Sequence, residues 1–375
     1  MKRFSPIWLN LGLLMFGTGS VWAQTPKYAN AFLDVGVGAR GIAMSQAVVA
    51  SANDATAAFW NPAGLTDMRR DIQFGFMHHE HFAGIVKFDY GGLAVKFSEK
   101  DAGAFTFIRS GVDDIPNTLE LLDANGNVDY DRVQSFSAAD YAFLLSYARK
   151  LDRKNRWSLG GSAKVIHRHI GGFGTGWGFG IDLGLKFQHN NWSAAAMFRD
   201  ASSTITQFKY STDAFRVIFI ETGNEVISSS TEIAVPRMTV GGAYALHIKD
   251  KFLVRPELQF TVTTDGRRNV LLATDAVSVD PAFGLELGYN DLIFIRGGVG
   301  RFQYLKNPSP DGGFEGQSLS FLPTAGLGLQ IKALSLDYTL ANFGTSLVGL
   351  SHVFSLRLDL FKASNLPSDN KTKSP

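Results

Sequence analysis

The stretch GARGIAMSQAVVASANDATAAFWNPAGL, residues 38–65, decides how the rest of the sequence is interpreted. It is rich in small residues, and Asp54 can cap a short helix that runs to Phe59. Asn61-Pro62 ends that helix, because the residue before a proline avoids helical backbone angles. Nearly all of the later sequence is typical of β-strands. One helical piece before a long run of strands predicts a plug in the mouth of a closed barrel.

The composition is that of a large β-protein without cysteine chemistry. The chain has 375 residues, of which 45% are hydrophobic and 12% aromatic, with 39 glycines and 30 phenylalanines. This is enough material for one large domain. The absence of cysteine excludes disulfides, thiol catalysis and a lipid-modified cysteine. Without Lys2 and Arg3 of the leader, basic and acidic residues are equal in number, so nothing favours nucleic acid as a partner.

The first residues are typical of a secretory signal. Lys2-Arg3 precede an apolar run at 7–16, and the small residues around Ala23 predict cleavage before Gln24. No later stretch approaches the ~18 uncharged apolar residues of a membrane-spanning helix. Two classes therefore remain: a large soluble β-protein and an outer-membrane barrel of a Gram-negative bacterium.

The predicted strands favour the barrel. They are roughly 10–14 residues long, which suits a tilted membrane crossing and exceeds the usual ~5–6 residues of a soluble strand. Glycine in a strand usually marks the close approach of another backbone, and a plug in the lumen would supply one. A soluble sandwich is the alternative. Residues 175–188 show the pattern, with one face formed by Trp177, Phe179, Ile181, Leu183, Leu185 and Phe187 and the other by Gly176, Gly178, Gly180, Asp182, Gly184, Lys186 and Gln188.

The connections alternate between tight turns and long loops, as in outer-membrane barrels. The strands number about 14 if residues 84–98 form one strand with a bulge at Gly91-Gly92, where the apolar face changes parity. The long loops, which would face outward, are 111–137, 201–234, 264–280 and 303–317.

We therefore predict an all-β, 14-stranded antiparallel transmembrane barrel with a short helical hatch in its lumen. The predicted boundaries are a signal peptide at 1–23, the hatch at 24–70, the barrel at 71–361 and a disordered periplasmic tail at 362–375. A linker in the periplasm is the alternative for the hatch segment.

Several motifs resemble known outer-membrane proteins. Asp54-Ala55-Thr56 and the hatch residues Trp60, Asn61, Pro62, Ala63 and Gly64 resemble the N-terminal hatch of FadL-like barrels. The fuller pattern is similar to the PorV/PorQ family of the Bacteroidetes. It comprises GVDDIPNT at 111–118, FSAADYA at 136–142, LDY at 336–338 and ANFG at 341–344.

The resemblance implies a binding protein and not an enzyme. FadL-like proteins are 14-stranded barrels, many of which import hydrophobic molecules. PorV-like proteins take part in type IX secretion, in which they bind the C-terminal signal domain of cargo or a large translocon subunit. A docking role would use the outer loops, with Asp113, Asp114 and Ile115 in one loop and the apolar run containing Phe215, Ile218 and Phe219 in another.

Two other functions remain open at this point. A FadL-like channel for hydrophobic compounds predicts an apolar pocket between hatch and wall, and a lateral opening at a kink such as Gly91-Gly92. A purely structural barrel within an envelope complex is the third. Outer-membrane lipid is an expected partner in every case.

The sequence offers few sites for metals or catalysis. Asp123, Asn125, Asn127 and Asp129 alternate as the oxygen ligands of a calcium loop do, although an exposed Asn-Gly turn has the same pattern. No other cofactor is expected. Imidazoles at His78, His79, His81, His167 and His169 could hold a transition metal, but unpaired surface histidines are commoner. The glycines of 171–180 lack the helix that a phosphate loop needs. Arg255/Glu257 and Arg357/Asp359 are predicted to face the lumen, where they pair with each other or with the hatch.

Overall fold

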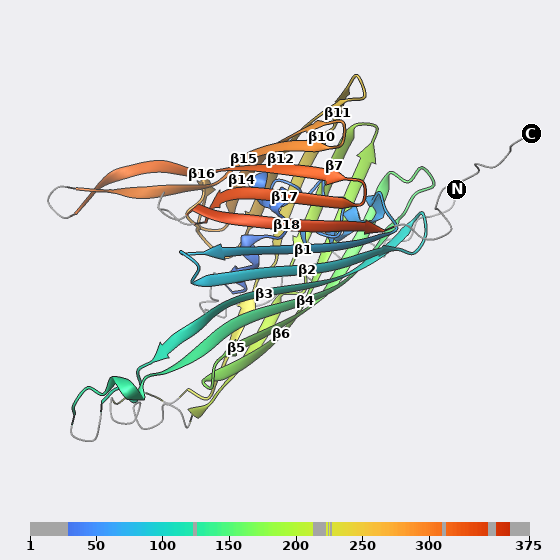
Figure 1. Cartoon of the computed structure of the whole chain (residues 1–375). Coiled ribbons are helices and arrows are strands. Elements are labelled where there is room, and N and C mark those ends of the chain that lie inside the picture. The colour runs from blue at the N-terminus through green and yellow to red at the C-terminus, as the bar shows by residue number, and fades with distance from the viewer. Residues whose placement is uncertain are drawn as a thin grey trace, which may run out of the picture.

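The strands close into a barrel. The computed structural model describes residues 29–122, 126–212, 223, 225, 227–309, 313–343 and 350–360. β1 (Ile72–His81) pairs with β2 (Val86–Lys96) on one side and with β18 (Leu350–Leu360) on the other, so the first and last strands meet. All these neighbours are antiparallel, and Figure 1 shows the closed wall.

Eighteen strand segments make up 14 barrel strands, because three barrel strands are interrupted. β7 (Trp192–Arg199) and β8 (Thr204–Tyr210) both pair with β6 (Gly174–His189) and continue one another. β9 (Ser229–Ala234), β10 (Arg237–Tyr244) and β11 (Leu246–Ile248) form the next barrel strand, followed by β12 (Phe252–Thr263) with β13 (Leu272–Ala273). The uninterrupted strands are β1, β2, β6 and β18, given above, together with β3 (Asp101–Asn117), β4 (Gln134–Lys150), β5 (Trp157–Ile170), β14 (Ser278–Tyr289), β15 (Ile293–Pro308), β16 (Phe314–Ile331) and β17 (Leu334–Asn342). The predicted strand number is confirmed.

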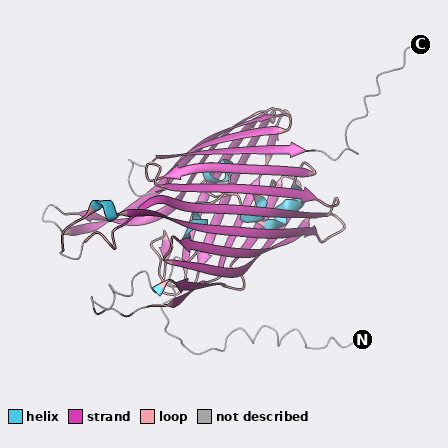
Figure 2. Cartoon of the chain, turned by 60° about the horizontal axis from the view of Figure 1, so that its bottom comes forward, coloured by secondary structure: helices cyan, strands magenta, loops and turns pink. Residues whose placement is uncertain are grey.

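Three of the predicted long loops are partly strand. The β3–β4 ladder continues as far as Asn117 opposite Gln134, so that loop is residues 118–133, which include η4 (Tyr130–Arg132). The predicted loop 201–234 is wrong over much of its length, because β8 and β9 lie within it. The β15–β16 pair also extends to Pro308 opposite Phe314. Both extended hairpins project from one end of the barrel (Figures 1 and 2).

The predicted bulge at Gly91-Gly92 is wrong. The register between β1 and β2 runs without a shift from Ile72 opposite Val95 to His81 opposite Val86. The pattern of apolar residues changes parity at this point because Tyr90 points into the lumen and not toward lipid. Gly92 lies on the same inward face, and a Cβ added there would be 2.2 Å from the Tyr90 hydroxyl. Glycine thus makes room for an inward aromatic ring, and the wall has no kink here.

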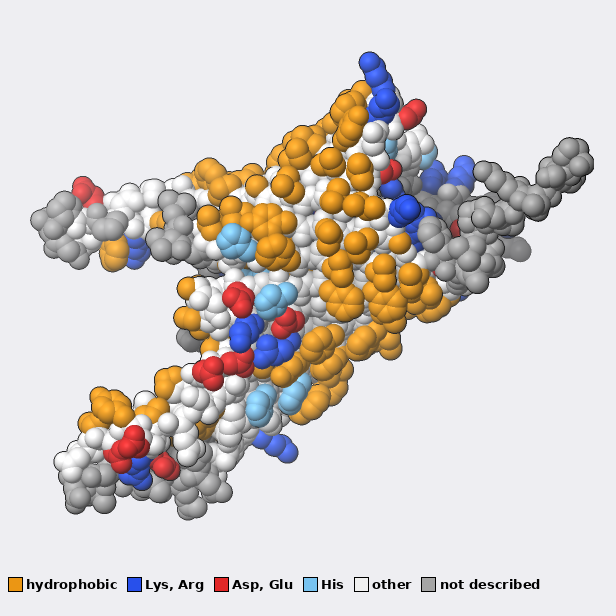
Figure 3. All heavy atoms as spheres, in the orientation of Figure 1, with side chains coloured by type: hydrophobic (Ala, Val, Ile, Leu, Met, Phe, Trp, Pro, Cys, Tyr) orange, Lys and Arg blue, Asp and Glu red, His pale blue; other side chains and the backbone are white. Residues whose placement is uncertain are grey.

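The outer face is apolar and the inner face is polar, the reverse of a soluble sandwich. On β6, Trp177 and Phe179 are 50% and 63% exposed, whereas Asp182 and Lys186 on the inward face are 2% and 3% exposed. Figure 3 shows hydrophobic side chains covering the middle of the wall. The described helices are too short to cross a membrane, so none is a candidate span.

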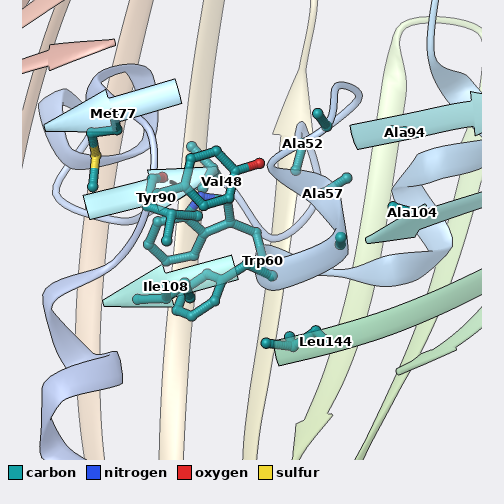
Figure 4. Packing of buried hydrophobic residues seen from close by; sticks show 14 of the residues in the cluster. Val48, Ala52, Ala57, Trp60, Met77, Tyr90, Ala94, Ala104, Ile108 and Leu144 are labelled. Carbon is teal, nitrogen blue, oxygen red and sulfur yellow. Dashed lines mark hydrogen bonds between the residues drawn. The ribbon is translucent and has the colours of Figure 1, made fainter. Parts of the chain in front are cut away.

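The hatch, described over residues 29–70, fills the lumen with short helical turns: η2 (Ala31–Val35), α1 (Ala39–Ala43), α2 (Ala57–Trp60) and η3 (Pro62–Asp67). The helix predicted to follow Asp54 is the single turn α2, and Asn61 then caps η3 by accepting from the Ala63 amide at 3.1 Å. One buried cluster joins hatch and wall (Figure 4), with Trp60 among the wall residues Tyr90, Ile108 and Leu144. The lumen is therefore a packed core.

We expect Gly160→Val on β5 to unseat the hatch. A Cβ there would lie 2.4 Å from the Ala63 nitrogen and 2.5 Å from the Pro62 carbonyl carbon, and these backbone atoms cannot rotate away. Overpacking of this kind costs about 1–3 kcal/mol of unfolding free energy, measurable by urea denaturation. The control is Gly161→Val, which points outward and meets only ordinary contacts of 3.4 Å and longer. Equal effects of the two variants would contradict this seating.

Candidate functional site

The Trp60 side chain joins two parts of the hatch that are separated in the sequence. Its indole Nε1 donates to the Val37 carbonyl at 2.9 Å, and the side chain is buried. Cβ atoms placed on Gly36 and Gly41 would lie 2.6 and 2.9 Å from the indole, so both positions require glycine. Gly36 also has a φ of +86°, which side chains rarely adopt. The aromatic ring and these glycines fix the two halves of the hatch against each other.

Asn61 ties the hatch to the wall and is fully buried. Its Nδ2 donates to the Val49 carbonyl at 3.1 Å within the hatch and to the Leu185 carbonyl of β6 at 3.3 Å. Its Oδ1 accepts from the Ala63 amide. An amide offers two donors and one acceptor oxygen, and all three groups are used here. The sequence motif therefore marks a structural joint.

Pro62, Ala63 and Gly64 lie flush against other backbone. Pro62 and Ala63 contact the wall at Gly160 and Gly184, where a Cβ would lie within 3.0 Å of hatch atoms. Gly64 faces the Ala52 carbonyl oxygen, 2.3 Å from the position of an added Cβ. The structure thus brings together the five hatch residues Trp60, Asn61, Pro62, Ala63 and Gly64 of the sequence analysis.

The other end of the hatch is latched by ion pairs. Asp54 Oδ2 lies 3.0 Å from Arg357 of β18, and Arg40 Nε lies 2.8 Å from Glu286 of β14. Burial alone would raise the pKa of Asp54, but Arg357 and Arg40 hold it below its usual range. The Asp54 carboxyl is therefore ionised at neutral pH and attracts both guanidinium groups.

Of the four predicted lumenal charges, only Arg255 bonds neither to the other member of its pair nor to the hatch. Arg357 contacts Asp359 at 3.2 Å, as expected. Arg255 pairs with Glu286 at 2.6 Å and not with Glu257, because Glu257 instead accepts from the Ala50 amide of the hatch at 2.7 Å. The pattern of alternation placed these residues on the inner face but could not identify the cross-strand partner.

The lumen differs on the two sides of the hatch. On the side of the tight turns lies a cavity of about 180 Å³ lined mainly by charged residues, among them Arg40, Arg69, Arg255, Arg296, Glu286 and Asp337. On the side of the long loops, β2, β3, β5 and β8 each contribute a buried apolar side chain to the lumen: Phe88, Ile108, Ile166 and Phe208. They lie beside a charged group, in which Arg168 pairs with Asp140 at 2.7 Å and with Glu232 at 2.8 Å. A hydrophobic molecule would therefore meet both apolar and charged surface on the loop side.

Two lumenal histidines were not anticipated as core residues. His79 is buried, and its ring stacks between Phe88 and Phe343 at centroid distances of 4.9 and 5.3 Å. Neither of its ring nitrogens has a hydrogen-bond partner, and His81 packs edge-on against it at 4.1 Å. His78 points outward instead and pairs with Asp89. Within the described ranges, no three His, Cys, Asp or Glu side chains are grouped to hold a metal.

Of the six predicted docking residues, three lie on a strand and three lie outside the residues that the structure describes. Asp113, Asp114 and Ile115 lie on β3, where Asp114 has a φ of +58° at a register shift. Asp113 Oδ2 accepts from Lys87 Nζ at 3.0 Å. Phe215, Ile218 and Phe219 lie outside the described residues.

The proposed calcium ligands are also divided. Asp123 and Asn125 lie outside the described residues, whereas Asn127 and Asp129 lie within them. Asp129 Oδ1 accepts from the Asp131 amide at 3.1 Å and caps η4. The calcium site stays a prediction.

Comparison with known proteins identifies the fold. The chain is similar to the CymD monoaromatic hydrocarbon channel, with a TM-score of 0.53 and 14% identity over 88% of this chain and 98% of that one. The Ralstonia pickettii toluene transporter TbuX has a TM-score of 0.50 and 13% sequence identity, over 87% of this chain and 98% of that one. The P. putida toluene transporter TodX has a TM-score of 0.51 and 11% sequence identity, over 87% of this chain and 99% of that one. No family model and no curated protein matches. The chain has the fold of these three proteins, a closed 14-stranded antiparallel β-barrel that resembles outer-membrane proteins of Gram-negative bacteria.

Asp54→Asn should loosen the latch. We expect a loss of about 1–3 kcal/mol in unfolding free energy, because Arg357 loses one of two carboxylate partners. Since the folded pKa of Asp54 is lowered, its contribution is complete above the unfolded value of about 3.9 and disappears as pH falls through the folded pKa. Urea midpoints measured against pH should show a constant gap between the two proteins above about pH 5, narrowing in stronger acid. A gap that does not change with acid would contradict the assignment.

Proposed function

We propose that this protein is an outer-membrane channel for small hydrophobic compounds, with the hatch as its gate. The observation that carries the proposal is the group of buried apolar side chains on the loop side of the hatch, Phe88, Ile108, Ile166 and Phe208, which the charged cavity on the turn side lacks. Three structural neighbours are described as hydrocarbon channels or toluene transporters, which supports the same class of substrate.

The hatch must move for anything to pass. Its backbone contacts the wall at glycines on β5, β14 and β15, and the buried cluster leaves the hatch and wall in direct contact. The lumenal cavity beneath the hatch is lined by charges, which an apolar molecule cannot replace as partners. Transport therefore requires a displaced hatch and not a standing pore.

The Gly91-Gly92 region does not supply the lateral opening that the channel hypothesis predicted, since β1 and β2 pair continuously there. The interruption between β7 and β8 is the larger irregularity of the wall. It includes Asp200 and Ser203, both with positive φ, and Asp200 is anchored by Lys164 at 2.6 Å. A buried ion pair fixes this segment, so the proposal places the moving part in the hatch.

A cysteine pair can test the gate. Ser45 Oγ of the hatch lies 2.9 Å from Thr324 Oγ1 of β16, and the natural chain has no cysteine. Ser45→Cys with Thr324→Cys should form a bridge, since a disulfide needs about 2.05 Å between sulfurs and small adjustments suffice. We expect the oxidised variant in liposomes to lose uptake of a hydrophobic tracer such as a fluorescent toluene analogue, and reductant to restore it.

The matched control joins two wall strands and leaves the hatch free. Ser146 on β4 and Ser162 on β5 are cross-strand partners with hydroxyls 2.7 Å apart. Ser146→Cys with Ser162→Cys should keep its uptake when oxidised. Uptake that survives the hatch bridge, or that both bridges abolish, would contradict hatch gating.

A docking role in type IX secretion is the second candidate. It is supported by the resemblance to the PorV/PorQ family and by the β3–β4 and β15–β16 hairpins, which project past the rest of the rim. Such hairpins offer edges and side chains to a cargo signal domain or a translocon subunit. A channel for small molecules has no evident need of them.

Shortening one hairpin tests the docking role. Asn117 and Gln134 form the last β3–β4 pair, so Asn-Gly in place of residues 118–133 makes a two-residue turn in register. If the tip docks cargo, this variant should assemble but lose secretion and co-purification in the native cell. Trimming residues 309–313 of the other hairpin is the control. Normal secretion by the first variant would exclude its tip as the docking site.

A further inference from the structure

Two buried histidines on the loop side of the hatch lack the hydrogen bonds that buried polar groups need. Neither Nδ1 nor Nε2 of His79 has a partner, and Nε2 of His81 has none either. The two residues are only 1% and 3% exposed. Folded proteins seldom leave buried polar atoms unbonded, so these nitrogens need an explanation. A purely structural position would be filled as well by a phenyl ring, which carries no group to satisfy.

An aromatic ring lies directly against these imidazoles. The Phe343 ring is nearly parallel to His79, with an angle of 13° and 5.3 Å between centroids, and it meets His81 edge-on at 4.3 Å. Phe88 of β2 also stacks on His79, at 4.9 Å. Arg301 of β15 lies over Phe343, with its Cζ 5.4 Å from the ring centroid. Phe343 thus occupies a slot formed by His79, His81 and Arg301.

The charged groups of the slot also have hydrogen-bonding capacity left. Arg301 donates to the Asp34 carbonyl of the hatch at 3.2 Å, and no described carboxylate forms an ion pair with it. It interacts over a longer distance with Asp280 of β14, whose Oδ1 is buried and has no partner. A guanidinium has five N–H donors, so most of those on Arg301 are unused. Unused donors and acceptors therefore surround a space that holds one aromatic ring.

The slot lies where a solute from outside would first reach the hatch. β1 ends at His81 and β17 ends at Asn342, both on the side of the long loops. The Phe343 ring is only partly buried and packs against the cluster that joins hatch and wall. A molecule that took the place of this ring would therefore contact the hatch and the wall together.

We propose that this slot binds a phenol, that is, a small aromatic compound with a hydroxyl group. The inference rests on the channel function proposed above and names the class of solute. The ring of the phenol replaces the Phe343 ring, stacked on His79 and beneath Arg301. A neutral imidazole has one donor and one acceptor nitrogen, and a hydroxyl group both donates and accepts. The hydroxyl group can therefore bond to the nitrogens that have no partner in the closed state.

Other small aromatic compounds fit the slot less well. A hydrocarbon has no polar group, so it would leave the imidazole nitrogens buried and unbonded, as Phe343 does. A carboxylate only accepts hydrogen bonds. It would leave the acceptor nitrogen of each imidazole without a donor, and it would be repelled by Asp280. The hydroxyl group alone matches both kinds of unused atom.

Equilibrium dialysis of the full chain in lipid nanodiscs tests the proposal, with binding to empty nanodiscs subtracted. The probes are toluene, p-cresol and p-toluate, which differ only in the group opposite the methyl. The readout is the ratio of p-cresol to toluene affinity, compared between variants, so that partition into lipid cancels. We expect His79→Phe to lower this ratio about tenfold, as loss of a hydrogen bond would. Its urea midpoint should stay the same or rise, because two unbonded nitrogens are removed.

Phe343→Ala should bind p-cresol more tightly than the natural chain, because the protein's own ring no longer competes. The matched control is Phe208→Ala. Phe208 of β8 is also a buried ring on the loop side, with Arg168 over it at 5.3 Å. Arg168 is already paired with Asp140 and Glu232, so a hydroxyl group finds no unpaired charge there. This variant should keep the natural affinity for p-cresol.

Three results would overturn the proposal: a ratio that His79→Phe leaves unchanged, an equal gain in p-cresol affinity from Phe208→Ala and Phe343→Ala, or tighter binding of p-toluate than of p-cresol. If the natural chain binds p-cresol and toluene but all variants share one ratio, only the recognition of the hydroxyl group fails. If it binds neither compound, the channel function fails as well.

Discussion

Backbone-to-backbone contact between hatch and wall is the constraint on which the rest of the structure depends. Where the hatch touches the barrel, the wall has no room for a Cβ: Gly160 faces the backbone of Pro62 and Ala63, and Gly298 faces the backbone of Met44 and Ser45. Strand interiors normally avoid glycine, because it contributes no packing and loses most entropy on ordering. Here each of these glycines allows a segment of the hatch to approach the wall. The packing of the hatch in the lumen then stabilises the strands that the glycines weaken.

The alternation of side chains was sufficient to predict the barrel, its strand number and the presence of the hatch. It failed where the lumen acts as a core. A bulge was predicted at Gly91-Gly92 because the apolar face changes parity there, but Phe88 and Tyr90 face inward and pack in the same buried cluster as the hatch. Once a plug occupies a lumen, both faces of a strand can be apolar, and periodicity no longer distinguishes them.

The sequence also did not predict which residues pair with each other across the sheet. Glu286 accepts from Arg40, Arg255 and Arg296, which come from three different parts of the chain. Residues 201–234 were predicted as a loop, but β8 lies within them and pairs with β6, and β9 pairs with β8. Pairing between strands that lie apart in the sequence cannot be read from the alternation within one strand.

The latch has a consequence for biogenesis. The hatch is synthesised first, but Asp54 and Arg357 are 303 positions apart, and Ala39 bonds to Ser355 across 316. These partners arrive only with the last strand, the one that also closes the wall against β1. Such long sequence separations make assembly slow. The plug therefore cannot be fully seated in an open, unfinished sheet, and a barrel that fails to close leaves its N-terminal segment without its final partners.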